Sequence, residues 1–182
     1  MCHALLQDPS FFLLLFRIDE QLAADTRAGG CACGGVLHSA RYPRKLRGCP
    51  AQVREHYCWR LSFCCASCRR RTTPGSVRFL GRRVYLAVVL TLVPPRGNAT
   101  AHPLMSLLGV PVRTLNRWRA WWQRDFFDTP FWQSVRGRFE TPVLSEGLPQ
   151  SLVERFDAQT PAQRQVQVLR FVAPLNTRCV ST

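Results

Sequence analysis

The sequence is short of acidic residues, has almost no lysine and contains no long apolar run. Aspartate and glutamate total 11 against 25 lysine and arginine residues, which gives a formal net charge of +14 at pH 7. Lys45 is the only lysine, so arginine carries the charge, and its planar guanidinium suits bidentate contacts with phosphate and guanine. This imbalance favours a polyanionic partner, DNA or RNA, over an anionic membrane surface.

Two apolar runs, 11–16 (FFLLLF) and 84–93 (VYLAVVLTLV), are too short to cross a membrane, since a spanning helix needs about 20 residues. The N-terminus also lacks the basic segment and the small-residue cleavage site of an export signal. We therefore expect a cytoplasmic, nucleoid-associated protein with no membrane partner. In that compartment the nine cysteines would be reduced thiols or metal ligands rather than disulfides.

The motifs of common catalytic sites are missing as well. The sequence has no Ser/His/Asp set, no phosphate-binding loop and no paired carboxylates in a basic region. Glu55 is the only acid between residues 31 and 124, and nothing marks it as a general base. The sequence therefore predicts a protein that is not an enzyme.

Local signals predict helices towards both ends of the chain. A capping side chain followed by proline at the first helical position is a strong helix start. The first of these helices should run over 8–28 and stop at the Gly29-Gly30 pair. Strands are expected within 36–42 and 56–64, whereas 82–93 is ambiguous between helix and strand. The expected helix starts are Asp8-Pro9, Thr129-Pro130 and Thr160-Pro161.

Two cysteine pairs are the first functional signal. Cys65 and Cys68 form a C-x-x-C pair, whose tight turn aims two thiolates at one ion. Cys31 and Cys33 form a shorter C-x-C pair, and the Gly34-Gly35 pair behind it lets the chain turn back. Four thiolates in a tetrahedron suit Zn²⁺, and two such turns on hairpin tips make a zinc ribbon. The zinc would be structural, because so small a unit is marginal on burial alone.

The ligand set has alternatives. Cys64 can replace Cys65, because adjacent residues of a strand point to opposite faces and only one of them can bind the ion. The competing interpretation is that the cysteines are reduced core thiols, and disulfides are the least favoured. Weaker candidate ligands are Cys49, Cys58, His38 and His56.

Basic runs surround the proposed metal at 42–48 (YPRKLRG), 69–74 (RRRTTP) and 81–83 (GRR). A charge run is often only a solvated face, but the mutual repulsion of three runs costs stability unless a polyanion relieves it. We expect contacts with backbone phosphates, so that affinity falls steeply with salt. The predicted phosphate contacts are Arg44, Lys45, Arg69, Arg70 and Arg71.

A helix-turn-helix is predicted over 101–122 (AHPLMSLLGVPVRTLNRWRAWW). Gly109 would supply the positive φ of the turn, and 112–122 would be the recognition helix. Arginine pairs with guanine and asparagine with adenine, so the outward side chains suit major-groove reading. The alternative is a plain helical hairpin with solvated arginines. The predicted DNA contacts of this helix are Arg113, Thr114, Asn116 and Arg117.

The pattern CxCGG…CCxxC followed by LGVPVRTLNRWRAWW, within 29–124, resembles zinc-ribbon plus helix-turn-helix proteins associated with bacterial transposons. The same two modules form the N-terminal recognition part of several insertion-sequence transposases. The catalytic half of a transposase, with three carboxylates holding two metals, is missing here. The resemblance implies an accessory or regulatory factor of a mobile element, with a transposase or another subunit as partner. By this resemblance the zinc ligands are Cys31, Cys33, Cys65 and Cys68, and the DNA contacts are Arg113, Asn116 and Arg117.

We therefore expect an α+β protein, a small zinc-ribbon β module followed by a mainly helical region, that binds double-stranded DNA at specific sequences. One alternative is binding of RNA or single strands, with the aromatic cluster of 121–132 as a stacking platform rather than the core we favour. The other is a protein-interaction adaptor whose zinc ribbon is only a scaffold. The expected parts are an N-terminal helix (1–30), the zinc-ribbon module (31–80), the helix-turn-helix region (81–128) and a C-terminal helical segment (129–182).

Overall fold

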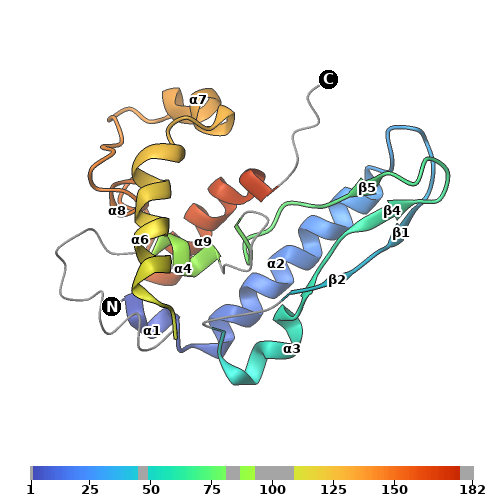
Figure 1. Ribbon diagram of the computed structural model, residues 1–182, viewed down its shortest axis with the longest axis horizontal. Helices are drawn as coiled ribbons and strands as arrows, with labels where there is room; N and C mark the ends of the chain where they lie inside the picture. Colours follow the sequence, from blue (N-terminus) through green and yellow to red (C-terminus); the bar gives the residue numbers. More distant parts are fainter. Residues whose placement is uncertain (1, 45–48, 81–86, 93–108, 177–182) are drawn as a thin grey trace.

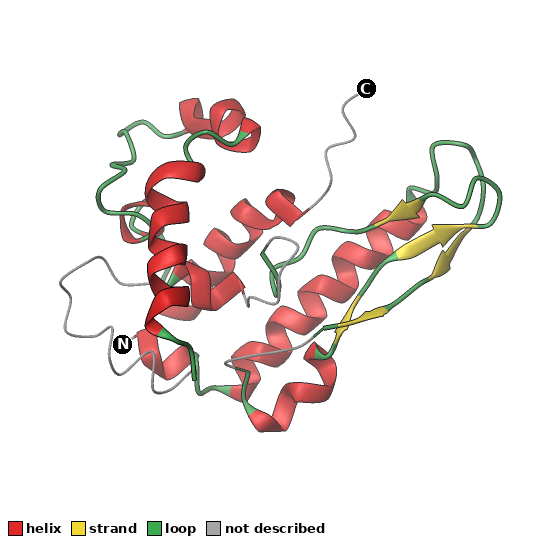
Figure 2. Cartoon of the chain, viewed as in Figure 1, coloured by secondary structure: helices red, strands yellow, loops and turns green. Residues whose placement is uncertain are grey.

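The computed structural model describes residues 2–44, 49–80, 87–92 and 109–176, which form a mixed α and β structure (Figure 1). Helices make up most of it, and short antiparallel strands gather towards one end of the long axis (Figure 2). The described helices are α1 (Cys2–Leu5), α2 (Pro9–Ala28), α3 (Arg54–Tyr57), α4 (Ala87–Thr91), α6 (Val112–Ala120), α7 (Pro130–Val135), α8 (Gln150–Val153) and α9 (Pro161–Val172). Single 3-10 turns cover Ala51–Val53, Arg136–Arg138 and Ala173–Asn176, and a π-helical segment, Trp121–Asp125, extends α6.

The ends of α2, the longest described helix, follow from the local sequence. Asp8 caps the helix by accepting a hydrogen bond from the Ser10 backbone N–H at 2.9 Å, and proline occupies the first turn. The helix ends at Gly29, and Gly30 takes a left-handed φ of 68°, which favours glycine. The predicted helix over 8–28 is therefore confirmed.

Five short strands lie beside α2 (Figure 2): β1 (Leu37–Ser39), β2 (Tyr42–Pro43), β3 (Trp59–Arg60), β4 (Phe63–Cys65) and β5 (Arg71–Thr72). They form two antiparallel sheets, a three-stranded sheet of order β1-β4-β5 and a two-stranded sheet of β2 and β3, which together we call the ribbon. The chain runs out through β1 and β2 and returns through β3 and β4, and β5 pairs with the other side of β4. His56 and Tyr57, which we expected in a strand, lie in α3 instead. Tyr57 is buried there and donates its hydroxyl to the Phe12 carbonyl of α2 at 2.7 Å, so packing overrides its β preference.

The later helices begin where the sequence predicts. Thr129 caps α7 by accepting a hydrogen bond from the Trp132 N–H at 3.1 Å. Thr160 caps α9 and forms a capping box with Gln163, in which each side chain accepts a bond from the other residue's backbone N–H. The ambiguous segment 82–93 is helical over α4, its main described part.

Two apolar clusters stabilise the described chain. The larger joins α2 to α4, α6, α7 and α9 and contains the fully buried Phe12 and Leu15. In the same cluster the ring centre of Trp122 is 4.8 Å from that of Phe126, which is 5.1 Å from that of Trp132. The aromatic cluster near α6 is therefore core, as favoured, rather than an exposed platform. A smaller cluster under the ribbon contains Ala23, Leu37, Phe63 and Cys65.

Candidate metal centre and nucleic-acid interface

Four cysteine sulfurs from two loops meet at the end of the three-stranded sheet. The Cys33 Sγ lies 3.5 Å from the Cys31 Sγ and 3.5 Å from the Cys65 Sγ, and the sulfurs of Cys31 and Cys68 are 3.6 Å apart. All four sulfurs lie within 4.8 Å of one another. Thiolates that surround a tetrahedral ion at about 2.3 Å stand about 3.8 Å apart, so these four cysteines could hold one metal ion.

The first loop directly follows α2 and depends on two glycines. Gly34 donates its N–H to the Cys31 carbonyl at 2.8 Å and has a left-handed φ of 78°. Gly35 leaves room for the other loop, because an added Cβ there would lie 2.6 Å from the Cys65 Sγ and 2.7 Å from the Ser67 Oγ. These glycines explain how a pair as short as C-x-C turns back and reaches the second pair.

The second loop leaves β4 at Cys65, which lies opposite Leu37 of β1. Arg69 closes the loop by donating its N–H to the Cys65 carbonyl at 3.2 Å. Arg69 also has a φ of 59°, which is uncommon for a residue with a side chain. The tight turn places the sulfurs of Cys65 and Cys68 on the same side, facing the first loop.

Backbone N–H groups of the loops act on the thiols. The N–H of Cys68 lowers the pKa of Cys65 to about 6, against the opposing effect of burial. The N–H of Gly35 lowers the pKa of Cys33. At Cys68 the N–H of Arg70 lowers the pKa, but the neighbouring thiols, Cys33 first, raise it to about 12. Cys33, Cys65 and Cys68 therefore compete for negative charge, and a bound cation would let all three be thiolates.

The choice between Cys64 and Cys65 is resolved in favour of Cys65. The Cys64 Sγ turns away from the cluster and lies 3.5 Å from the Arg69 carbonyl oxygen. Alternation along β4 explains this, because neighbouring residues of a strand face opposite sides. Within the described residues, the other candidates also lie outside the cluster: Cys49, Cys58, His38 and His56.

The ribbon's arginines divide into an exposed group and a buried group. Arg69, Arg70 and Arg71 are exposed in the loop and strand next to the cysteines, and Arg44 is half-buried. The predicted contacts at Lys45 and at 81–83 lie outside the described residues. The buried group is Arg60 and Arg78.

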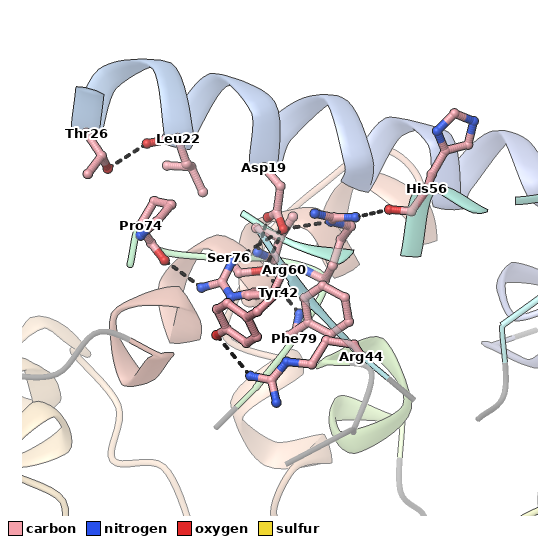
Figure 3. A network of polar contacts seen from close by, with 12 residues as sticks. Asp19, Leu22, Thr26, Tyr42, Arg44, His56, Arg60, Pro74, Ser76 and Phe79 are labelled. Atoms are coloured by element: carbon pink, nitrogen blue, oxygen red, sulfur yellow. Dashed lines mark hydrogen bonds and ion pairs between the residues drawn. The ribbon is translucent and has the colours of Figure 1, made fainter. Parts of the chain in front are cut away.

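The two buried arginines share one carboxylate, that of Asp19 in α2. Asp19 and Arg60 are labelled in Figure 3. The Nε of Arg78 donates to the Asp19 Oδ2 at 2.7 Å, and the Arg60 Nη1 lies 3.9 Å from the same oxygen. Asp19 also accepts hydrogen bonds from the Val77 N–H at 2.7 Å and from the Ser76 hydroxyl at 2.5 Å. Burial lowers the pKa of Arg60, and Asp19 opposes that effect. These charges fasten the ribbon to α2 and do not face a partner.

α6 has a buried face and an exposed face. Leu115 and Trp118 lie in the large apolar cluster. Of the predicted contact residues, Thr114 is half-buried. The Nη1 of Arg119 donates to the Asn116 Oδ1 at 3.3 Å, which orients the amide. The exposed predicted contacts are Arg113, Asn116 and Arg117.

The turn before α6 is described only in part. Gly109 has a φ of 57°, the left-handed conformation that the prediction required. The first helix of the predicted pair, 101–108, lies outside the described residues. The helix-turn-helix as a whole therefore remains a prediction.

No protein-family model matches this chain, and no curated protein or solved structure matches it either. None of the helices in the described ranges combines the length and the apolar character that spanning a bilayer requires.

Proposed function

We propose that this chain is a non-catalytic protein that binds double-stranded DNA at specific sequences, with α6 as the base-reading helix. The proposal depends mainly on one observation, that α6 has one face buried in the core and one face exposed. Leu115 and Trp118 anchor it in the core, and two arginines and Asn116 project from it. Arginine matches the O6/N7 edge of guanine and asparagine the N6/N7 edge of adenine, and a helix fits the major groove. Gly109 has a backbone conformation that suits the turn of a helix-turn-helix.

The ion that we propose for the cysteine cluster is zinc in a structural role. A set of four thiolates is typical of closed, tetrahedral zinc sites, which leave no position open for a substrate. Cys31, Cys33, Cys65 and Cys68 would hold the ion. Binding would fix the loop that carries the three exposed arginines 69–71, so that they could contact backbone phosphates and set the register of the protein on the duplex.

The buried state of the aromatic cluster weighs against the rival function of single-strand or RNA binding. Trp122 and Phe126 are fully buried, so their faces cannot stack on bases, and Trp121, Phe127 and Phe131 are partly buried against the same core. The resemblance of 29–124 to transposon-associated proteins supports a role as an accessory or regulatory factor of a mobile element. In that role a transposase or another subunit would supply the chemistry.

A selection of random duplexes by the zinc-loaded protein tests this function. We expect a defined sequence to be enriched, and we expect Arg113→Ala/Arg117→Ala to abolish the preference, since each bidentate base contact contributes roughly 1–3 kcal/mol of discrimination. The control, Arg136→Ala/Arg170→Ala, removes the same charge from exposed positions on other elements and should keep the preference. No enriched sequence, or tighter binding to single strands than to duplex, would refute the proposal. A protein that binds neither would favour the adaptor function.

A further inference from the structure

Tyr42 in the ribbon lies against two arginine side chains. The guanidinium carbon of Arg44 is 4.8 Å from the centre of the Tyr42 ring, and that of Arg71 is 5.6 Å from it. The Nη2 of Arg44 also donates a hydrogen bond to the Tyr42 hydroxyl oxygen at 3.2 Å (Figure 3). Both ring distances are within the roughly 6 Å over which an aromatic face attracts a cation, so one ring holds both side chains.

The strand pairing explains how these three residues meet. Tyr42 is in β2, and the Arg44 N–H donates to the Cys58 carbonyl at 2.7 Å, which continues the pairing beyond the strand. Residues two apart in an extended segment share a face, so Arg44 follows Tyr42 on the same side. Arg71 comes from β5, which is joined to the rest of the sheet by β4. The arrangement therefore depends on the ribbon and not on one local turn.

The surroundings of Tyr42 are strongly cationic. Arg60 lies opposite Tyr42 in the β2–β3 pair, and the carboxylate nearest to Arg60, Asp19, is shared with Arg78. Arg71 is exposed and forms no ion pair with any residue in the described ranges. An anionic ligand would relieve the repulsion between these guanidiniums.

A guanidinium that lies over a ring presents the N–H groups at its edge to the side, where an acceptor such as a phosphate oxygen can approach. Restraint by the ring also reduces the side-chain entropy that the arginine loses when it binds a ligand. We propose that Tyr42 is a positioning residue, which holds Arg44 and Arg71 as a preorganised pair for one backbone phosphate of a nucleic acid. This inference rests on the proposed DNA-binding function and names how the ribbon would contribute to it.

The experiment measures the affinity of the zinc-loaded protein for a short duplex of mixed sequence between about 50 and 200 mM salt. Arg71→Gln removes a charge, so it should weaken binding and reduce the slope of log K against log salt by about 0.9. Arg71→Lys and Tyr42→Leu keep every charge. They should leave the slope unchanged and lower the affinity roughly threefold to tenfold. Leucine removes the ring that holds the pair, and lysine lacks the planar fork of donors that lies over the ring and meets the phosphate. Tyr42→Phe keeps the ring and should stay within about threefold of wild type.

A double variant separates positioning from general support of the fold. In the Arg71→Gln background Tyr42→Leu should cost less affinity than in the wild type, because the ring then holds one arginine instead of two. Zinc content and thermal unfolding are measured for each variant. If Tyr42→Leu does not fold, the affinity of Arg71→Lys alone tests the inference, because that change is at an exposed position.

The outcomes are distinct. If Arg71→Lys binds the duplex as tightly as the wild type does, the inference is overturned. The proposed function still stands in that case, because the wild-type protein binds the duplex. Equal losses for Tyr42→Leu in the two backgrounds also overturn the inference, since they indicate a structural role only. A wild-type protein that fails to bind duplex at the lowest salt overturns the proposed function itself.

Discussion

At the scale of single residues, Gly35 lies so close to the cysteine cluster that a larger side chain has no room there. An added Cβ would lie 2.6 Å from the Cys65 Sγ and 3.0 Å from the Ser67 Cβ. Cys65 cannot move away easily, because it is fully buried and its sulfur is part of the cluster. Gly35→Ala should therefore separate the two loops, lower the affinity for zinc roughly tenfold and destabilise the protein by about 1–3 kcal/mol.

Competition with a chromophoric chelator measures this change in zinc affinity. Gly137→Ala is the matched control, because an added Cβ at Gly137 meets no atom within 4 Å. It should bind zinc as the wild type does. Equal zinc affinity in the two variants would contradict the close packing of the loops.

Cys49 provides a prediction about pH. Burial raises the pKa of its thiol from 9.0 to about 11, and Arg54 opposes this effect. Between these two values the folded protein keeps a proton that the unfolded chain has released. The stability that the protonated Cys49 thiol contributes is therefore complete below pH 9.0 and is lost as the pH rises through about 11. The unfolding free energy of the wild type should fall over this range by about 1 kcal/mol more than that of Cys49→Ala. The pKa shift by itself corresponds to a larger fall in the unfolding free energy, but solvent screens the partly exposed thiol and reduces the effect. Denaturant titrations at both ends of the range measure it, and parallel pH profiles would contradict it.

At the scale of elements, one carboxylate fastens the ribbon to α2. Asp19→Asn keeps the size of the side chain but leaves Arg60 and Arg78 buried without an opposite charge. We expect a loss of about 3–5 kcal/mol in the unfolding free energy of the zinc-loaded protein, measured in denaturant. Asp25→Asn, on the exposed side of the same helix, should change it by less than about 0.5 kcal/mol. Similar values for the two variants would show that the buried network contributes little.

How well each element could be predicted depends on the range of its interactions. The start of α2 depends on Asp8 and its next two neighbours, so the sequence alone was sufficient. The burial of Arg78 depends on Asp19, 59 positions away, and the sequence gives no sign of that distance. Tyr57 was assigned to a strand for the same reason, since its place in α3 depends on contact with Phe12.

In the candidate site, too, local features were predictable and features that depend on distant residues were not. Each cysteine pair is a local turn, so its spacing was enough to predict one metal-binding pair in each loop, with Cys64 left open as an alternative to Cys65. The choice of Cys65 over Cys64 depends on which face of β4 meets β1, and that is set by the pairing of Leu37 with Cys65. The contact of Arg71 with Tyr42 joins different strands and had no signal in the sequence beyond the basic runs.

At the scale of the whole molecule, α2 joins two parts with very different amounts of buried apolar surface (Figure 1). Its first half contributes Phe12 and Leu15 to the large cluster, and its second half contributes Ala23 to the small one. The first cysteine loop begins two residues after Gly29, at the end of the helix. The helical part therefore has a core of its own, whereas the ribbon has a four-residue cluster within the described chain.

Removal of zinc by a chelator should consequently unfold the outer ribbon and leave the helical core folded. Zinc binding contributes of order 10 kcal/mol to the folding of small metal modules, which exceeds what the burial of a few side chains supplies. Hydrogen exchange should show loss of amide protection in β1 and β4 but continued protection in α9, with recovery in the ribbon when zinc is restored. If α9 lost protection at the same chelator concentration as β4, the Asp19 network would be transmitting the loss of the metal through α2, and the two parts would unfold as one cooperative unit.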